Sequence, residues 1–130
     1  MDEHKITSDE KSIFIDYAFA INVENTKDVC EKIVEILDNS KHQMNIVIDA
    51  NNSHLTDNNA VATAGKMLKA FKSKINTLYV IGASGFQKIF FQTLFTLVGG
   101  KKDKHFKFMR DINDAKFDIE MRWKSYLDKQ

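Results

Sequence analysis

Residues 44–71 form the part of the sequence that most constrains the fold. Residues 45–50, Asn-Ile-Val-Ile-Asp-Ala, make a short apolar run rich in β-branched side chains, which predicts a buried strand. A polar loop follows over residues 51–56, and Asp57 then opens a helix. Apolar side chains recur in that helix at helical spacing, at Val61, Ala64, Leu68 and Phe71. A strand that leads directly into an amphipathic helix is typical of a parallel α/β sheet.

The rest of the chain repeats this alternation. A β-hairpin is predicted over residues 4–8 and 12–19, and a helix that begins near Asn25 or Thr26 extends to Leu37. Further strands are predicted at 77–81 and 105–109, separated by a helix over 86–98 that Gly99 and Gly100 end. Asp111 caps a last helix. The predicted fold class is therefore α/β, with an N-terminal β-hairpin followed by alternating helices and strands in a mostly parallel sheet with right-handed crossovers.

Composition narrows the class of protein. With 130 residues the chain is expected to form a single domain, residues 1–130. Its net charge of +1 argues against nucleic-acid binding, and its apolar runs are too short to cross a membrane. The start of the chain is polar and acidic, so no signal peptide is expected. With only one cysteine, Cys30, no internal disulfide can form, and we expect a cytoplasmic protein.

The loop and helix start at 53–59 are the predicted site for a protein partner. The residues assigned to it are Ser53, His54, Asp57, Asn58 and Asn59. A helix cap is the simpler role for Asp57, and one carboxylate can both cap and contact a partner. A hydrolase would require His54 within hydrogen-bond reach of Ser84 or Asp49, but the sequence lacks the Gly-x-Ser-x-Gly elbow. The spacing of the histidines predicts no metal site, and no cofactor is expected.

The helix predicted over 86–98 carries more apolar side chains than one sheet face can bury. Its surplus, assigned to Phe91, Phe95 and Val98, packs under a neighbouring helix and the Trp123 region or remains as an exposed patch. Such a patch would serve a homodimer or an apolar ligand. The candidate dimer or ligand surface comprises Phe90, Phe91, Leu94, Phe95 and Val98.

The order of these motifs resembles the STAS domain, the fold of anti-sigma-factor antagonists and of the cytoplasmic tails of sulphate transporters. The matching features are Asp49 at the end of the central strand, residues 56–62 opening the next helix, residues 81–86 and residues 111–115. The likeness is greatest to small bacterial STAS-like proteins, which are often compared with lipid-carrier CRAL-TRIO domains. It covers nearly the whole chain and implies regulation through a protein partner.

One departure from the STAS pattern bears on regulation. Asn59 stands where the family has its switch serine, Asn58 stands at the preceding serine, and Ala60 replaces the motif glycine. Asparagine has no hydroxyl to accept a phosphoryl group, so control by phosphorylation is not expected here. The sequence therefore predicts a non-catalytic, homodimeric regulatory module that binds a protein. The alternative is a small apolar-ligand or lipid carrier that uses helix 86–98.

Overall fold

The computed structural model describes residues 5–17, 20–100 and 105–128, with side chains described to residue 124. Its elements follow the alternation expected from the sequence. In chain order they are β1 (Lys5–Ser8), β2 (Ser12–Asp16), β3 (Ala20–Ile21), α1 (Val23–Asn39), β4 (Met44–Asp49), β5 (His54–Leu55), α2 (Ala60–Lys69), a 3₁₀ turn (Lys72–Lys74), β6 (Ile75–Ile81), α3 (Phe86–Gly99), β7 (Phe106–Met109) and α4 (Ile112–Asp128).

Within the described residues, the main sheet has five strands in the order β1-β2-β4-β6-β7. Only β1 is antiparallel to its neighbour, while β2, β4, β6 and β7 run parallel. The predicted fold class is thus confirmed, with β4 at the centre of the sheet as its apolar sequence requires.

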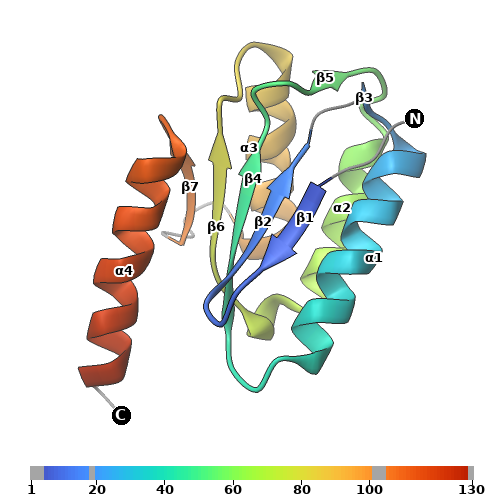
Figure 1. The fold of residues 1–130 in the computed structure, drawn as a ribbon. Coiled ribbons are helices and arrows are strands. Elements are labelled where there is room, and N and C mark those ends of the chain that lie inside the picture. Colours follow the sequence, from blue (N-terminus) through green and yellow to red (C-terminus); the bar gives the residue numbers. More distant parts are fainter. Residues whose placement is uncertain (1–4, 18–19, 101–104, 129–130) are drawn as a thin grey trace.

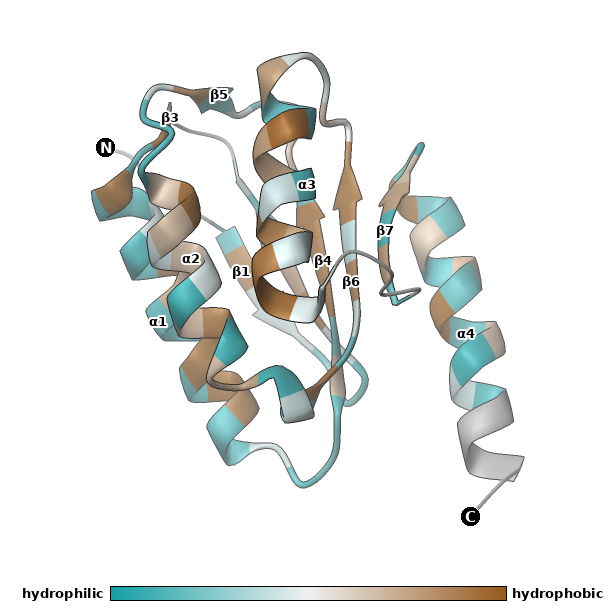
Figure 2. Ribbon diagram, turned by 180° about the vertical axis from the view of Figure 1, so that it is seen from behind, coloured by the Kyte–Doolittle hydropathy of each residue, from teal (hydrophilic) through white to brown (hydrophobic). Residues whose placement is uncertain are grey.

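Helices cover the two faces of the sheet unequally. Helices α1, α2 and α3 lie together on one face, and α4 lies on the other, beyond β7 (Figures 1 and 2). Each face of the sheet has its own apolar core, and successive residues of a strand point to opposite faces. Ile46 and Ile48 belong to the core beneath α1, α2 and α3. Val47 belongs to the core that contains Ala115 and Ile119 of α4.

Two helices begin at different residues from those predicted. Helix α1 starts at Val23, because the Asn22 side chain accepts a hydrogen bond from the backbone N–H of Asn25 at 2.8 Å and caps it. Helix α2 starts at Ala60, three residues after Asp57. The carboxylate of Asp57 instead accepts the N–H of Asn59 at 2.9 Å and fixes the turn before the helix.

The second predicted arm of the hairpin is also shorter, since β2 ends at Asp16 and residues 18–19 lie outside the described part of the chain. Ala20–Ile21 forms a separate strand, β3, which pairs in parallel with β5 inside the predicted polar loop. In the part of the chain that the structure describes, no helix has the length and apolarity needed to cross a membrane.

Candidate functional site

The loop between β4 and α2 is held in place by a dense set of hydrogen bonds. The Asp49 carboxylate accepts the backbone N–H and the side-chain amide of Asn51, at 3.0 and 2.9 Å. Further along, the N–H groups of Thr56 and Asp57 donate to the carbonyl of Ile21, at 3.1 and 3.2 Å. The short β3–β5 pair and these bonds make the loop a fixed rim at the carboxyl edge of the parallel strands, where α/β sheets bind their ligands.

The predicted partner-binding residues lie together on this rim. His54, Asn58 and Asn59 are exposed, and Ser53 and Asp57 are half-buried. Asn59 occupies the N-cap position of α2, and among the described residues no side-chain capping hydrogen bond is made there. The rim is therefore a solvent-facing, polar surface of nearly fixed shape.

Helix α3 adds apolar side chains beside this rim. The side-chain amide of Gln87 donates to the Ser53 hydroxyl oxygen at 3.0 Å, which joins the first turn of α3 to the loop. On either side of Gln87 in sequence, Phe86 is 81% exposed and Ile89 is 58% exposed. We call these two residues, with Ser53, His54, Asp57, Asn58 and Asn59, the carboxyl-edge surface.

The apolar surplus that the sequence assigns to Phe91, Phe95 and Val98 does not form an exposed patch on α3. Phe90, Phe91, Leu94 and Val98 are buried, at 5% exposure or less, so these four side chains do not form a surface that a second copy could contact. Phe95 is half-buried against Phe106 and Phe108, at ring-centroid distances of 5.6 and 5.0 Å. The apolar arc of α3 is wide because the helix contacts α2 and also packs its side chains on the sheet. Its exposed apolar residues are Phe86, Ile89 and Leu97.

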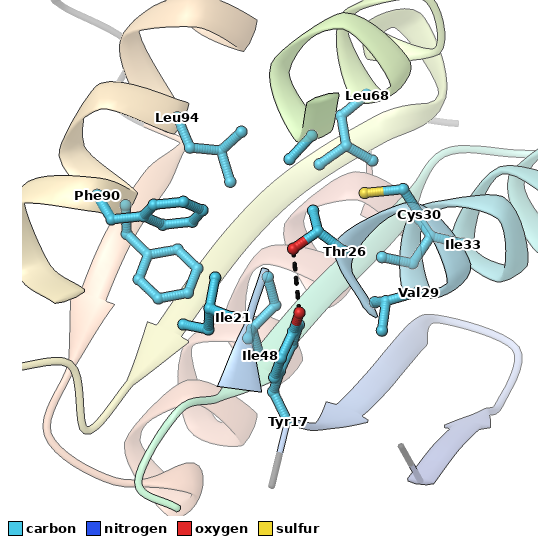
Figure 3. Close-up of a pocket in the computed structure, with 12 residues that line it drawn as sticks. Tyr17, Ile21, Thr26, Val29, Cys30, Ile33, Ile48, Leu68, Phe90 and Leu94 are labelled. Atoms are coloured by element: carbon cyan, nitrogen blue, oxygen red, sulfur yellow. Dashed lines mark hydrogen bonds between the residues drawn. The ribbon is translucent and has the colours of Figure 1, made fainter. Parts of the chain in front are cut away.

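A small apolar cavity of about 30 Å³ lies among α1, α2, α3 and the sheet (Figure 3). Phe90, Phe91 and Leu94 line it from α3, and Cys30 lines it from α1. Its lining includes one polar pair, the hydroxyl groups of Tyr17 and Thr26, which are hydrogen-bonded to each other at 3.0 Å. Burial raises the pKa of the Cys30 thiol to about 12. A cavity that holds a benzene-sized ligand has a volume of about 150 Å³, so this one would have to expand to admit a lipid chain.

The structure does not assemble the residues of the hydrolase alternative. His54 makes no hydrogen bond to Ser84 or Asp49, and the Asp49 carboxylate is occupied by Asn51. Within the described residues, no three His, Cys, Asp or Glu side chains meet in a group that could hold a metal ion.

Comparison with solved structures supports the fold. The chain is similar to an uncharacterised protein of the DUF3478 family from Shewanella loihica PV-4, which has a SpoIIAA-like fold. The two share 15% sequence identity with a TM-score of 0.65, over 90% of this chain and 92% of the other. At that identity the likeness concerns the fold alone, and it confirms the STAS-like architecture expected from the motifs.

Comparison by sequence identifies the family. None of the curated proteins matches the chain. The sequence description of the divergent CRAL/TRIO domain, however, matches residues 11–128 and so includes both the carboxyl-edge surface and the apolar cavity. The chain therefore belongs to the divergent CRAL/TRIO domain family.

Proposed function

We propose that the protein is a non-catalytic regulatory module of the cytoplasm, that it acts as a homodimer, and that it binds a protein partner through the carboxyl-edge surface. The observation that supports the binding role is Phe86, an aromatic side chain 81% exposed beside a rim that is fixed by hydrogen bonds. Aromatic side chains, Phe among them, are enriched in the cores of protein interfaces. A fixed rim also lowers the ordering cost of binding.

The polar residues of the rim would supply specificity around this anchor. His54, Asn58 and Asn59 are exposed and offer hydrogen-bond donors and acceptors next to the apolar pair Phe86 and Ile89. Because Asn59 replaces the switch serine, partner binding at this position would not be controlled by phosphorylation.

Affinity capture with matched variants tests this role. The wild-type protein, Phe86→Asp and Gln92→Asp would each serve as bait, with captured proteins quantified by mass spectrometry. Gln92 is a suitable control because it is exposed on the same helix, α3, but lies outside the carboxyl-edge surface. We expect a partner that wild type and Gln92→Asp retain and Phe86→Asp loses.

Purified partner then gives the affinity by titration calorimetry. Loss of an aromatic anchor should weaken binding by about 2 kcal/mol or more, or roughly thirtyfold in Kd. Equal capture by all three baits, with every variant folded by circular dichroism, would reject the carboxyl-edge surface as the binding site.

A second candidate function is the binding of a small apolar ligand. It is favoured by the family match together with the cavity beneath Phe90, Phe91 and Leu94. Native mass spectrometry of the purified protein, followed by solvent extraction, would detect such a ligand. Ala64→Leu would fill the cavity from its wall and should abolish ligand binding. An unchanged ligand content in this variant would exclude the cavity as the binding site.

A further inference from the structure

Helix α4 presents an apolar pair to solvent on the side that faces away from the sheet. Its inner side buries Ala115 and Ile119, whereas Phe117 is 69% exposed and Met121 is 57% exposed. No other described element lies against this outer side, and Figure 1 shows the helix standing at the margin of the molecule. Two large exposed apolar side chains one turn apart on a single helix indicate an interaction surface.

Charged residues flank this pair in a regular pattern. Asp114, Phe117, Met121 and Lys124 are separated by three, four and three residues, which is the spacing of a coiled-coil seam. At about 100° per residue they fall within roughly 80° of the helix circumference, on the outer side. We call these four residues the α4 outer stripe.

The order of charges in the stripe fits a second copy of the same helix in antiparallel orientation. Pairing centred between Phe117 and Met121 places Phe117 of one copy beside Met121 of the other. The same register brings Asp114 opposite Lys124 at both ends of the contact, so opposite charges meet twice. A parallel arrangement would instead place Asp114 against Asp114 and Lys124 against Lys124. A two-fold interface requires this kind of self-complementarity.

A hollow beside the stripe supports the same occupant. It has a volume of about 400 Å³ and is lined by Lys11, Glu120, Met121, Trp123 and Lys124. In the antiparallel register this hollow lies next to the place reached by Phe117 of the second copy. The surface thus offers both a protruding aromatic side chain and a recess to receive it.

We infer that two copies of the chain associate through antiparallel packing of their α4 helices, with Phe117 and Met121 at the centre and Asp114 and Lys124 at the ends. This inference rests on the homodimer of the proposed function and assigns its interface. It places the interface on the face of the sheet opposite α3, so the carboxyl-edge surfaces of both copies remain accessible to a partner.

Light scattering coupled to size-exclusion chromatography, over a range of protein concentrations, tests the interface. Wild type should have the mass of a dimer, and Phe117→Asp and Met121→Asp should be folded monomers. Val23→Asp is the control, because Val23 is 38% exposed at the start of α1 and lies outside both proposed surfaces. This control should remain a dimer.

Charge exchange tests the orientation. Asp114→Lys and Lys124→Asp should each raise the dissociation constant of the dimer by about tenfold or more. The double variant should restore it, because the opposite charges meet again. Thermal unfolding of each variant separates weakened association from a destabilised fold.

The outcomes are distinguishable. A monomeric wild type would reject the homodimer of the proposed function and, with it, the α4 interface. A wild-type dimer that persists in Phe117→Asp and Met121→Asp would reject only the α4 interface. Single charge variants that weaken the dimer without rescue in the double variant would overturn the antiparallel orientation.

Discussion

The hydroxyl of Tyr79 donates a hydrogen bond to a carboxylate oxygen of Asp118 and so joins the interior of the sheet to α4. The same oxygen accepts a hydrogen bond from Nε of Arg122 at 3.0 Å and lies 3.5 Å from Nζ of Lys107. Burial raises the pKa of Tyr79 to about 12, and the hydrogen bond to Asp118 adds to that effect. Burial alone would raise the pKa of Asp118, but hydrogen bonds from Tyr79 and Arg122 outweigh it and hold that pKa below its ordinary value.

A first prediction concerns acid stability. Because the pKa of Asp118 is lowered in the folded state, its stabilising contribution is present above the unfolded pKa of about 4 and is lost as pH falls through the folded value. The difference in unfolding free energy between wild type and Asp118→Asn, measured in urea, should therefore shrink below about pH 4. A difference that stays constant from pH 7 down to the acid transition would count against this expectation.

Tyr79→Phe tests the hydrogen bond itself. The substitution should lower the free energy of unfolding by about 1 to 2 kcal/mol at neutral pH. The Asp118 carboxylate then loses the hydrogen bond from Tyr79 but keeps the one from Arg122. An unchanged free energy of unfolding at pH 7 would show that this hydrogen bond does not stabilise the packing of α4 on the sheet.

A second prediction concerns alkaline stability. The folded state holds the pKa of Cys30 near 12, whereas an unfolded thiol ionises near 8.5. Between these values only the unfolded state loses the proton, so stability falls as pH rises. Relative to Cys30→Ala, wild type should lose about 1.4 kcal/mol of unfolding free energy per pH unit from about pH 9 to 11. Parallel stability curves for the two proteins would contradict this expectation.

A third prediction concerns the contact between α2 and α3. A Cβ added at Gly65 would lie 2.9 Å from Cδ1 and 3.0 Å from Cβ of Leu97. Gly65→Ala should therefore destabilise the protein by about 1 kcal/mol, although alanine favours a helix by a similar amount. Leu97→Ala removes Cδ1, the atom nearest to the added methyl group. In the Leu97→Ala background, Gly65→Ala should therefore lower the free energy of unfolding by about 1 kcal/mol less than it does in wild type. Equal costs in the two backgrounds, measured by urea unfolding, would show that the helices already have room for a methyl group.

A fourth prediction concerns the rigidity of the carboxyl-edge surface. Gln87→Ala removes both hydrogen bonds from α3 to Ser53, one to its carbonyl oxygen and one to its hydroxyl oxygen. The loop then depends on β3–β5 pairing and on its own turns. Amide hydrogens of residues 51–57 should exchange faster in this variant by hydrogen-exchange mass spectrometry, while those of β4 remain unchanged. Gln92→Ala, at an exposed position on the same helix, is the control and should leave both segments unchanged.

Sequence reasoning succeeded where a local pattern decides the structure. The buried strand around Val47 and the end of α3 at the glycine pair follow from apolar runs and from glycine at a helix end, where Gly100 has a φ of +89°. The cap of α4 was also predicted, since the carboxylate of Asp111 accepts the N–H of Asp114 at 2.9 Å. These features depend on residues that are close in sequence.

Features that depend on distant contacts were missed. The pairing of Ala20–Ile21 with His54–Leu55 involves two residues on each side, too few to show a period of two. The helical wheel did not predict that Phe86 is exposed. It shows the direction of each side chain around the helix axis, but not which turns of the helix extend beyond the sheet. The half-buried Trp123 contacts His42 rather than α3, because α4 crosses to the other face.

The unequal covering of the sheet has a consequence for how the molecule opens. Among the described side chains of α4, only Ala115 and Ile119 are buried, whereas α1, α2 and α3 share one extensive core. Helix α4 should therefore behave as a separate cooperative unit that detaches at a lower free energy than global unfolding. If two copies pair through this helix, association would stabilise the least stable unit of the fold. The fraction of molecules in which α4 has detached and exposed its face of the sheet would then depend on the protein concentration.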